Sequence, residues 1–167
     1  MTLTTHGIVG AAVARVFAWH PVSAFFVAFL SHYIIDVLPH WDYDLKSARH
    51  DGNNHLNNDI VLNRDFVFDF IKIAFDAFFG LFLSFMVFQP AGNYQIFIIA
   101  FGVIGGVFPD FLQFAYFKFR CQPFILLQKF HHWCHTDILL TGRWISGTVL
   151  QIFFIIGSVA LSWFFVS

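Results

Sequence analysis

The stretch WISGTVLQIFFIIGSVALSWFFVS, residues 144–167, contains no charged side chain. A helix needs about 20 mostly apolar residues to cross the hydrocarbon core of a bilayer, so this stretch predicts a transmembrane helix. The rest of the chain has the same character, because 58% of its 167 residues are hydrophobic, only 11% are charged, and 26 are phenylalanine. A soluble domain of this size could not bury so much apolar surface. We therefore predict an integral membrane protein.

A second uncharged region lies over residues 77–109. The sequence QPAGN at 89–93 interrupts it with turn-forming residues. We expect one helix over about 66–88 and another over about 93–117.

The N-terminal region, residues 5–38, is also apolar but contains the pair His20-Pro21. Proline disfavours helical backbone at the residue before it, so a helix usually ends there. This predicts a short helix over residues 5–19 and a longer one over 21–38.

Lysine and arginine are concentrated in two polar segments, 39–65 and 118–143. The positive-inside rule places both at the cytoplasmic face, with the N-terminus inside and the C-terminus outside. Within the second segment, residues 123–135 are too few to cross a bilayer and predict a short interfacial helix. The predicted fold is a single all-α, polytopic membrane bundle over residues 1–167, with about five transmembrane helices.

This topology brings most histidines and aspartates to the cytoplasmic side, and His20 is the exception. The first motif is SHYIIDVLPHWD, residues 31–42. His32 and Asp36 are four residues apart and share a helix face, so they can present a nitrogen and an oxygen to one metal ion. Pro39 ends the helix and allows His40 and Asp42 to fold back toward the same point. The alternative is an Asp–His hydrogen bond between helices, but ionisable residues inside a membrane are usually functional.

The second motif is FHHWCHTD, residues 130–137. His131 and His135 are four residues apart and His132 and His135 three apart, so either pair can chelate a metal from a helix. The alternative is an interfacial band of amphipathic side chains. Cys134 and the distant Cys121 are expected to be free thiols.

The third motif is GGVFPD, residues 105–110. Its glycines allow close helix approach, and Pro109 leaves Asp110 beside freed carbonyl groups. Asp110 is either a ligand or a helix-end cap. His6 opens the first helix at the same depth as these motifs and is a further candidate ligand.

Two other patterns of charged and polar residues are interpreted as structural features and not as metal sites. Asp69, Lys72 and Asp76 form an i, i+3, i+7 ladder, interpreted as an ion-pair stack facing the bundle interior. Alternatively, Asp76 is a ligand and Lys72 contacts phosphate. The Asp- and Asn-rich stretch 51–59 resembles a calcium loop but has Leu56 where an EF-hand needs glycine, so we expect a solvated loop.

Together these motifs resemble the YdjM-like family of predicted inner-membrane, metal-dependent hydrolases of bacteria and archaea. The resemblance is carried by His6, Ser31-His32, Asp36, Pro39-His40, Pro109-Asp110, and His131 with His135-Thr136. It implies a bacterial or archaeal cytoplasmic membrane and a metal site at the cytoplasmic face. Thr136 stands where the family has serine.

We therefore expect a membrane-embedded metal-dependent hydrolase that acts on a lipid-linked or phosphoester substrate. Zinc is the expected metal, with manganese or magnesium as alternatives. The predicted ligands are His6, His32, Asp36, Asp110, His131 and His135. His40 or Asp42 is expected to act as general base.

The alternative hypothesis is a non-enzymatic membrane subunit that binds haem or a metal, or packs within a larger complex. The partners expected in either case are membrane lipids and other membrane subunits, including a second copy of the chain. The net charge of −1 provides no basic surface for nucleic acid.

Overall fold

The computed structural model describes residues 1–136, 138, 140 and 142–166. Asp137 of the second histidine motif and Ser167 at the end of the predicted C-terminal span lie outside the described residues. The helices are α1 (Leu3–Phe17), α2 (Pro21–Asp36), α3 (Arg64–Phe88), α4 (Asn93–Phe119), α5 (Phe124–Cys134) and α6 (Trp144–Val166). The all-α prediction is confirmed for the described part of the chain.

Three helices, α3, α4 and α6, are long and apolar enough to cross a membrane. On α3 and α6 most of the apolar surface points outward, as Phe75 and Ile156 illustrate with side chains 68% and 62% exposed. Exposed apolar surface on this scale is typical of a lipid-facing helix. These three helices indicate a membrane protein. The other two predicted spans, α1 and α2, are apolar but shorter, with 15 and 16 residues.

The helix boundaries follow the predicted signals. Pro21 occupies the first turn of α2, and the His20 ring caps this helix by accepting a hydrogen bond from the Val22 backbone N–H. Gln89 ends α3 in the left-handed conformation with φ of 42°, which reverses the chain at the predicted break. His20 is exposed and lies at the opposite end of α2 from Asp36, as the topology predicted.

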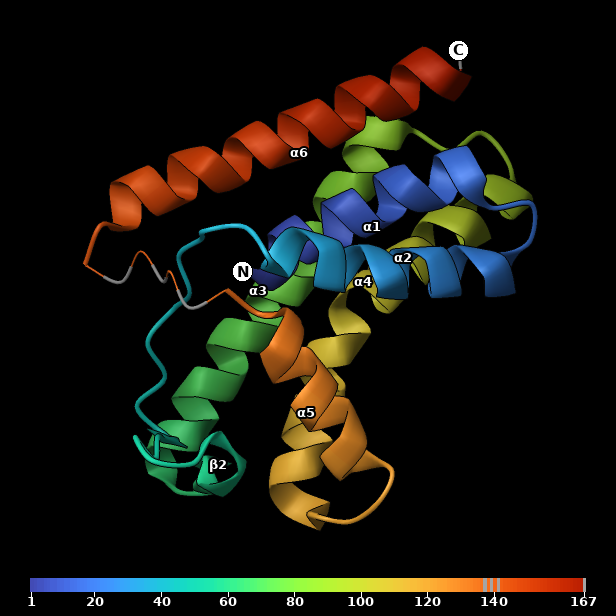
Figure 1. The fold of residues 1–167 in the computed structure, drawn as a ribbon. Coiled ribbons are helices and arrows are strands. Elements are labelled where there is room, and N and C mark those ends of the chain that lie inside the picture. Colours follow the sequence, from blue (N-terminus) through green and yellow to red (C-terminus); the bar gives the residue numbers. More distant parts are fainter. Residues whose placement is uncertain (137, 139, 141, 167) are drawn as a thin grey trace.

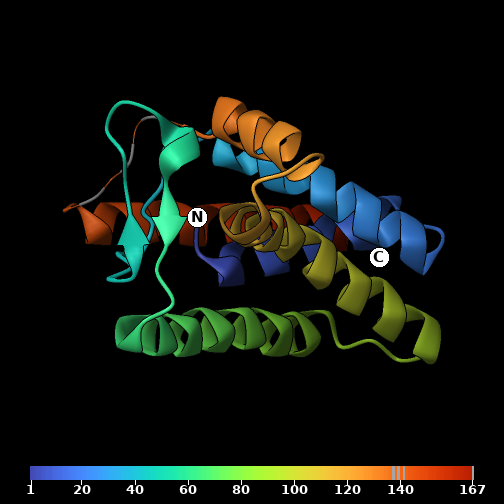
Figure 2. The ribbon, with the colours of Figure 1, turned by 90° about the horizontal axis from the view of Figure 1, so that it is seen from below.

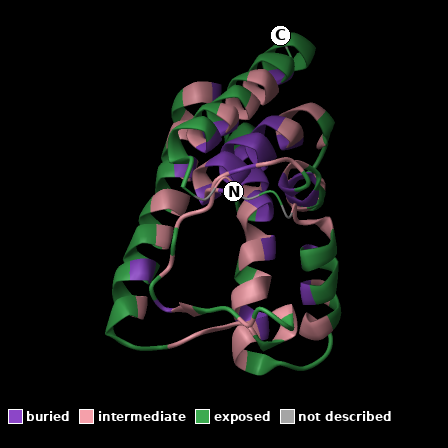
Figure 3. Cartoon of the chain, turned by 60° about the vertical axis from the view of Figure 1, so that its left-hand side comes forward, coloured by how far each residue is buried: buried purple, intermediate pink, exposed green. Residues whose placement is uncertain are grey.

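Helix α1 lies at the centre of the bundle and contacts α2, α3, α4 and α6 (Figure 1, Figure 2). The buried residues gather around it, as Figure 3 shows. Glycines on α4 allow this close packing, because a Cβ on Gly106 would overlap the His6 carbonyl oxygen, and a Cβ on Gly105 would overlap that of Phe25. The α1–α2 hairpin therefore rests on α4 with backbone nearly touching backbone.

The polar segment between α2 and α3 forms a loop with two short strands. Strands β1 (Ala48–Arg49) and β2 (Asp59–Ile60) pair antiparallel, with a 3-10 turn η1 (His55–Asn57) between them. The C-terminal end of α4 holds this loop, since Lys118 Nζ lies 2.9 Å from Asp59 Oδ1. Arg120 also donates to two carbonyl groups of the loop. The strand pair has no counterpart in the predicted all-helical fold.

Gly105→Ala should destabilise the bundle, because the new methyl group meets the Phe25 carbonyl in a closely packed contact. An overpacked contact of this kind costs about 1–3 kcal/mol. The expected result is a lower thermal unfolding midpoint in detergent, followed by circular dichroism. Gly157→Ala is the matched control, since nothing lies within 4 Å of a Cβ there. Equal midpoints for the two variants would contradict the packing described here.

Candidate metal centre

The carboxylate of Asp36, at the end of α2, lies among four histidine rings. Its side chain is only 1% exposed. Asp36 Oδ1 lies 3.2 Å from His6 Nε2 and 3.9 Å from His40 Nε2. Asp36 Oδ2 lies 3.1 Å from His32 Nε2 and 3.5 Å from His131 Nε2. In each of these four rings, Nε2 is the nitrogen that faces the carboxylate.

Two further carboxylates flank this group. Asp110 Oδ1 lies 3.7 Å from His32 Nε2 and 3.9 Å from His131 Nε2. Asp42 Oδ2 lies 3.3 Å from His40 Nε2 and 3.6 Å from His135 Nε2. The eight residues that the sequence singled out therefore meet in one place, here called the His–Asp cluster: His6, His32, Asp36, His40, Asp42, Asp110, His131 and His135.

The cluster forms where several chain segments converge. His6 comes from the first turns of α1, while His32 and Asp36 come from the last turns of α2. Two described residues after α5, Thr136 and Leu140, pair with the end of α2 and the segment after it. In this pairing the Thr136 N–H donates to the Asp36 carbonyl at 2.9 Å, and the Leu140 N–H donates to that of His40 at 2.8 Å. This pairing brings His135 to the cluster.

Three of the histidine rings are oriented by backbone carbonyl groups. His32 Nδ1 lies 2.8 Å from the Gly106 oxygen and His40 Nδ1 lies 2.8 Å from the Leu38 oxygen. His135 Nδ1 lies 3.0 Å from the Thr136 oxygen. A carbonyl oxygen only accepts, so each Nδ1 must donate, and in the neutral ring Nε2 then keeps its lone pair. This is the arrangement found at metal-binding histidines.

In the neutral rings the lone pairs of these Nε2 atoms point at carboxylate oxygens, so a proton or a cation is needed between them. His32 Nε2 and both ring nitrogens of His6 are buried without a hydrogen-bond partner. A buried polar atom without a partner costs about 1–3 kcal/mol. A cation between the nitrogens and the oxygens removes this cost.

The spacing also suits a metal ion. Ligand atoms about 2.1 Å from a tetrahedral zinc lie about 3.4 Å apart, close to the separations between Nε2 and carboxylate oxygens in the cluster. Among the described residues, three sets of ligand atoms could hold an ion: His6–His32–Asp36, His32–Asp110–His131 and Asp36–His40–His135. Buried His and Asp groups in this protein can thus hold a metal ion.

Positive charge is scarce around the three carboxylates. In the described part of the chain, no lysine or arginine pairs with them. The α-amino group of Met1 does, lying 2.8 Å from Asp42 Oδ1 and 3.3 Å from Asp36 Oδ1. Burial by itself would raise the pKa of Asp42, but His135 and His40 beside it hold that pKa well below its usual range. Asp42 is therefore an anion that attracts a cation.

Two predicted details differ from the structure. Asp110 is not at a helix end, because α4 continues through Pro109 as far as Phe119. His132 points away from the cluster and stacks on His55, with ring centroids 3.7 Å apart. Of the two possible histidine pairs in the second motif, the structure brings His131 and His135 to the site.

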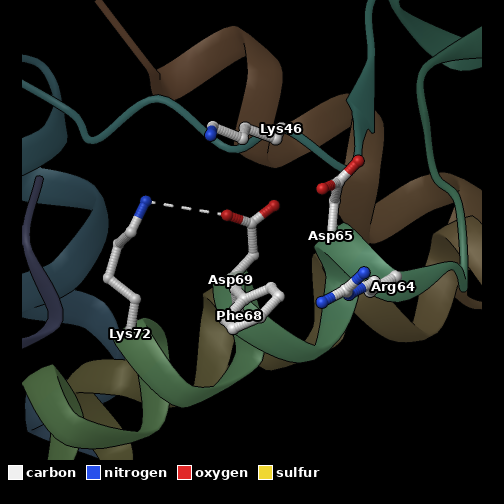
Figure 4. Close-up of a pocket in the computed structure, with 6 residues that line it drawn as sticks. All are labelled: Lys46, Arg64, Asp65, Phe68, Asp69 and Lys72. Carbon is white, nitrogen blue, oxygen red and sulfur yellow. Dashed lines mark ion pairs between the residues drawn. The ribbon is translucent and has the colours of Figure 1, made fainter.

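The Asp69–Lys72–Asp76 ladder is only partly an ion-pair stack. Lys72 Nζ lies 3.6 Å from Asp69 Oδ1, beside a cavity of about 530 Å³ that is separate from the His–Asp cluster (Figure 4). Asp76 instead accepts hydrogen bonds from Thr4 and Tyr43. Asp76 belongs to none of the possible metal-binding sets among the described residues.

Gln151 on α6 is a supporting residue that the sequence reasoning missed. Its Oε1 accepts hydrogen bonds from Thr2 and Thr5, and its Nε2 donates to the Trp41 carbonyl at 2.7 Å. Thr5 precedes His6 and Trp41 precedes Asp42, so Gln151 ties two cluster segments to α6. The sequence signal that could have identified Gln151 is an amide side chain within an uncharged, apolar helix.

Comparison with protein-family models, curated proteins and solved structures gave no match. The resemblance to the YdjM-like family therefore rests on the motifs, and the residues that carry it include seven of the eight in the His–Asp cluster, all but Asp42. Function has to be argued from the chemistry of the site.

Zinc should stabilise the folded protein, and Asp36→Asn should remove this effect because Asp36 contacts four of the five histidines in the cluster. A ligand at about 100 times its Kd adds about 2.7 kcal/mol to the free energy of unfolding. The measurement is the thermal unfolding midpoint in detergent with and without zinc. Asp65→Asn, at an exposed carboxylate on α3, is the matched control and should respond like the wild type. A zinc-induced shift that survives in Asp36→Asn would argue against this site.

Proposed function

We propose that this chain is a membrane-embedded, metal-dependent hydrolase of the YdjM-like kind that acts on a lipid-linked phosphoester. The observation that carries the proposal is the set of histidine Nε2 lone pairs that face three carboxylates in a buried cluster. Neutral imidazole and carboxylate together form a typical ligand set for zinc, with manganese or magnesium as alternatives. An ion held here would lower the pKa of a bound water and polarise the phosphoryl group.

The ligands in this proposal are those predicted from the sequence: His6, His32, Asp36, Asp110, His131 and His135. Three side chains of the cluster are partly exposed. Asp42, Asp110 and His135 are 35%, 31% and 24% exposed, whereas the side chains of Asp36, His6 and His32 are almost fully buried. Substrate would therefore enter past Asp42.

Asp42 suits the role of general base. It is an anion at a partly exposed position of the cluster and can accept a proton from an attacking water. The water oxygen adds to phosphorus, the ester bond to the leaving group breaks, and the leaving oxygen takes up a proton.

The position of the cluster along the helices suggests its depth in the membrane. Helices α1 and α2 have 15 and 16 residues, so each is about 23–24 Å long, shorter than a hydrocarbon core of about 30 Å. Both have their cluster-forming ends on the side of the polar segments 37–63 and 120–143. We place the cluster at the membrane interface, on the cytoplasmic side by the Lys/Arg bias, in a five-span bundle.

A cavity beside the cluster favours a lipid-linked substrate. It measures about 200 Å³ and lies between α1, α3 and α6. Its lining includes Thr5 and Trp41, the neighbours of His6 and Asp42 in the chain, and the apolar side chains of Phe79, Ile152 and Ile155. An acyl or isoprenyl chain is the kind of group that such a lining would accept.

The haem alternative has less support. The rings of His6 and His32 stack with centroids 3.8 Å apart, and carboxylates occupy the space in front of their Nε2 atoms. A haem needs an open, porphyrin-sized gap at its axial histidine. The cluster is better suited to a bare ion.

Asp42→Asn should abolish hydrolysis while metal binding is retained, because asparagine keeps the shape but cannot take up a proton. Loss of a general base typically lowers the rate by about 10²–10⁴-fold. The measurements are turnover of a chromogenic phosphodiester and of phospholipids in nanodiscs, alongside metal content. Asp44→Asn, at an exposed carboxylate two residues away, is the control. Unchanged turnover in Asp42→Asn would refute the role of Asp42, and no turnover of any phosphoester by the metal-loaded wild type would refute the reaction.

A further inference from the structure

The ligand atoms of the His–Asp cluster fall into two subsites that share Asp36. The inner subsite combines the two sets that have His32 in common, namely His6, His32 and Asp36 with Asp110 and His131. The outer subsite is the third set, Asp36, His40 and His135. We propose that the cluster binds two divalent ions, one in each subsite, with the Asp36 carboxylate bridging them. This inference rests on the proposed metal-dependent function and extends it.

One ion cannot use all of these ligands. Zinc in proteins is usually four-coordinate, and ligands on opposite sides of an ion are only about 4.2–4.4 Å apart when each bond is about 2.1–2.2 Å long. The seven candidate ligands of the described chain form three overlapping sets of mutually close atoms, and no single set contains them all. A single ion in the inner subsite would leave His40 and His135 without a role.

The outer subsite has the same construction as the inner one. His40 is completely buried, and both His40 and His135 engage backbone carbonyl groups through Nδ1. Their Nε2 atoms, with free lone pairs in the neutral rings, face the carboxylates. His40 Nε2 lies 3.9 Å from Asp36 Oδ1 and 3.3 Å from Asp42 Oδ2. A ring proton or a cation must therefore lie between each Nε2 and its carboxylate, and a divalent ion can fill this role.

The two oxygens of Asp36 are directed to different partners. Oδ2 faces His32 and His131 of the inner subsite, whereas Oδ1 faces His40 of the outer subsite as well as His6. A carboxylate with its oxygens divided in this way can bind one ion through each. Hydrolases with two metal ions hold them about 3.5–4 Å apart and use both to stabilise the attacking and leaving oxygens.

The three carboxylates of the cluster have one compensating charge within the described chain. The Met1 amino group lies 2.8 Å from Asp42 Oδ1 and 3.3 Å from Asp36 Oδ1. Together with one divalent ion it would balance the three negative charges, so the ligand geometry, and not the charge, indicates the second ion. With His40 as a ligand, Asp42 is the carboxylate left to act as base.

The test is the number and coupling of ions bound to the full-length protein in detergent. The protein is stripped with a chelator, reloaded with zinc or manganese and freed of excess metal. Zinc per chain is then measured by mass spectrometry, and manganese by electron paramagnetic resonance. The wild type should bind two zinc ions and show an exchange-coupled manganese signal.

The variants His135→Ala and His40→Ala should each lower the zinc content from two to one and convert the manganese signal to that of an isolated ion. Asp36→Ala should reduce the content below one. His132→Ala, at the neighbour of His131 that lies outside the cluster, is the matched control and should bind two. Unfolding midpoints of the variants show whether each one is folded.

The outcomes separate the two proposals. One zinc per chain in both the wild type and His135→Ala would overturn the second ion and the role of His135 as a ligand, and would leave a hydrolase with one ion in the inner subsite. Two ions without exchange coupling would overturn the Asp36 bridge. No bound zinc or manganese in the folded wild type would overturn both proposals.

Discussion

The structure of this protein depends on keeping one carboxylate, that of Asp36, buried among histidines. An ionised carboxylate in a water-free interior is tolerated only when positive charge or hydrogen-bond donors compensate it. Here Nε2 atoms from α1, α2, α5 and the segment after α2 lie within 4 Å of Asp36. Because the backbone carbonyl at Gly106 orients His32 and that at Leu38 orients His40, both neutral rings offer lone pairs. Apart from the Met1 amino group, 3.3 Å from Asp36 Oδ1, compensation must then come from ring protons or from a cation, and this requirement links the fold to the proposed function.

Close packing between the helices positions the histidine rings around Asp36. The α-carbon of Gly106 lies against the backbone of His6, while its carbonyl accepts the hydrogen bond from His32. A single small residue on α4 thus positions two rings that stack at 3.8 Å. On the other side of α1, the buried amide of Gln151 joins the N-terminal turn to the segment that carries Asp42. Apolar side chains on α3 and α6 meanwhile remain on the outside, as expected of helices in contact with lipid.

Much of the fold could be predicted from the sequence, because helix breaks have local chemical causes. The His20-Pro21 turn and the break at 89–93 lie where proline and turn residues place them, and the helices match the predicted ranges to within a few residues. The prediction that α1 and α2 also cross the membrane is not confirmed, because with 15 and 16 residues both are shorter than the roughly 20 residues of a usual span. The meeting of the eight residues was expected from a five-span topology, in which spans that alternate in direction bring distant motifs to one side. The structure confirms that the residues meet, while three helices are long and apolar enough to span. The sequence could not predict that His131, and not His132, would lie in the cluster. Both residues lie on α5, and only the face that α5 packs against the bundle distinguishes them. The backbone carbonyl groups of Gly106, Leu38 and Thr136, which orient three of the histidine rings, could not be predicted either, because every residue type has a backbone carbonyl.

The central claim is that the buried histidine nitrogens and aspartate oxygens bind a metal ion. X-ray absorption at the zinc edge of the zinc-loaded protein tests this directly, because it reports the atoms around the metal. We predict a first shell of nitrogen and oxygen at about 2.0–2.1 Å, with the outer-shell scattering typical of imidazole. Cys121 and Cys134 are both free thiols outside the cluster, so they provide an internal check. A sulfur shell at about 2.3 Å, or zinc that washes out on dialysis, would contradict the claim.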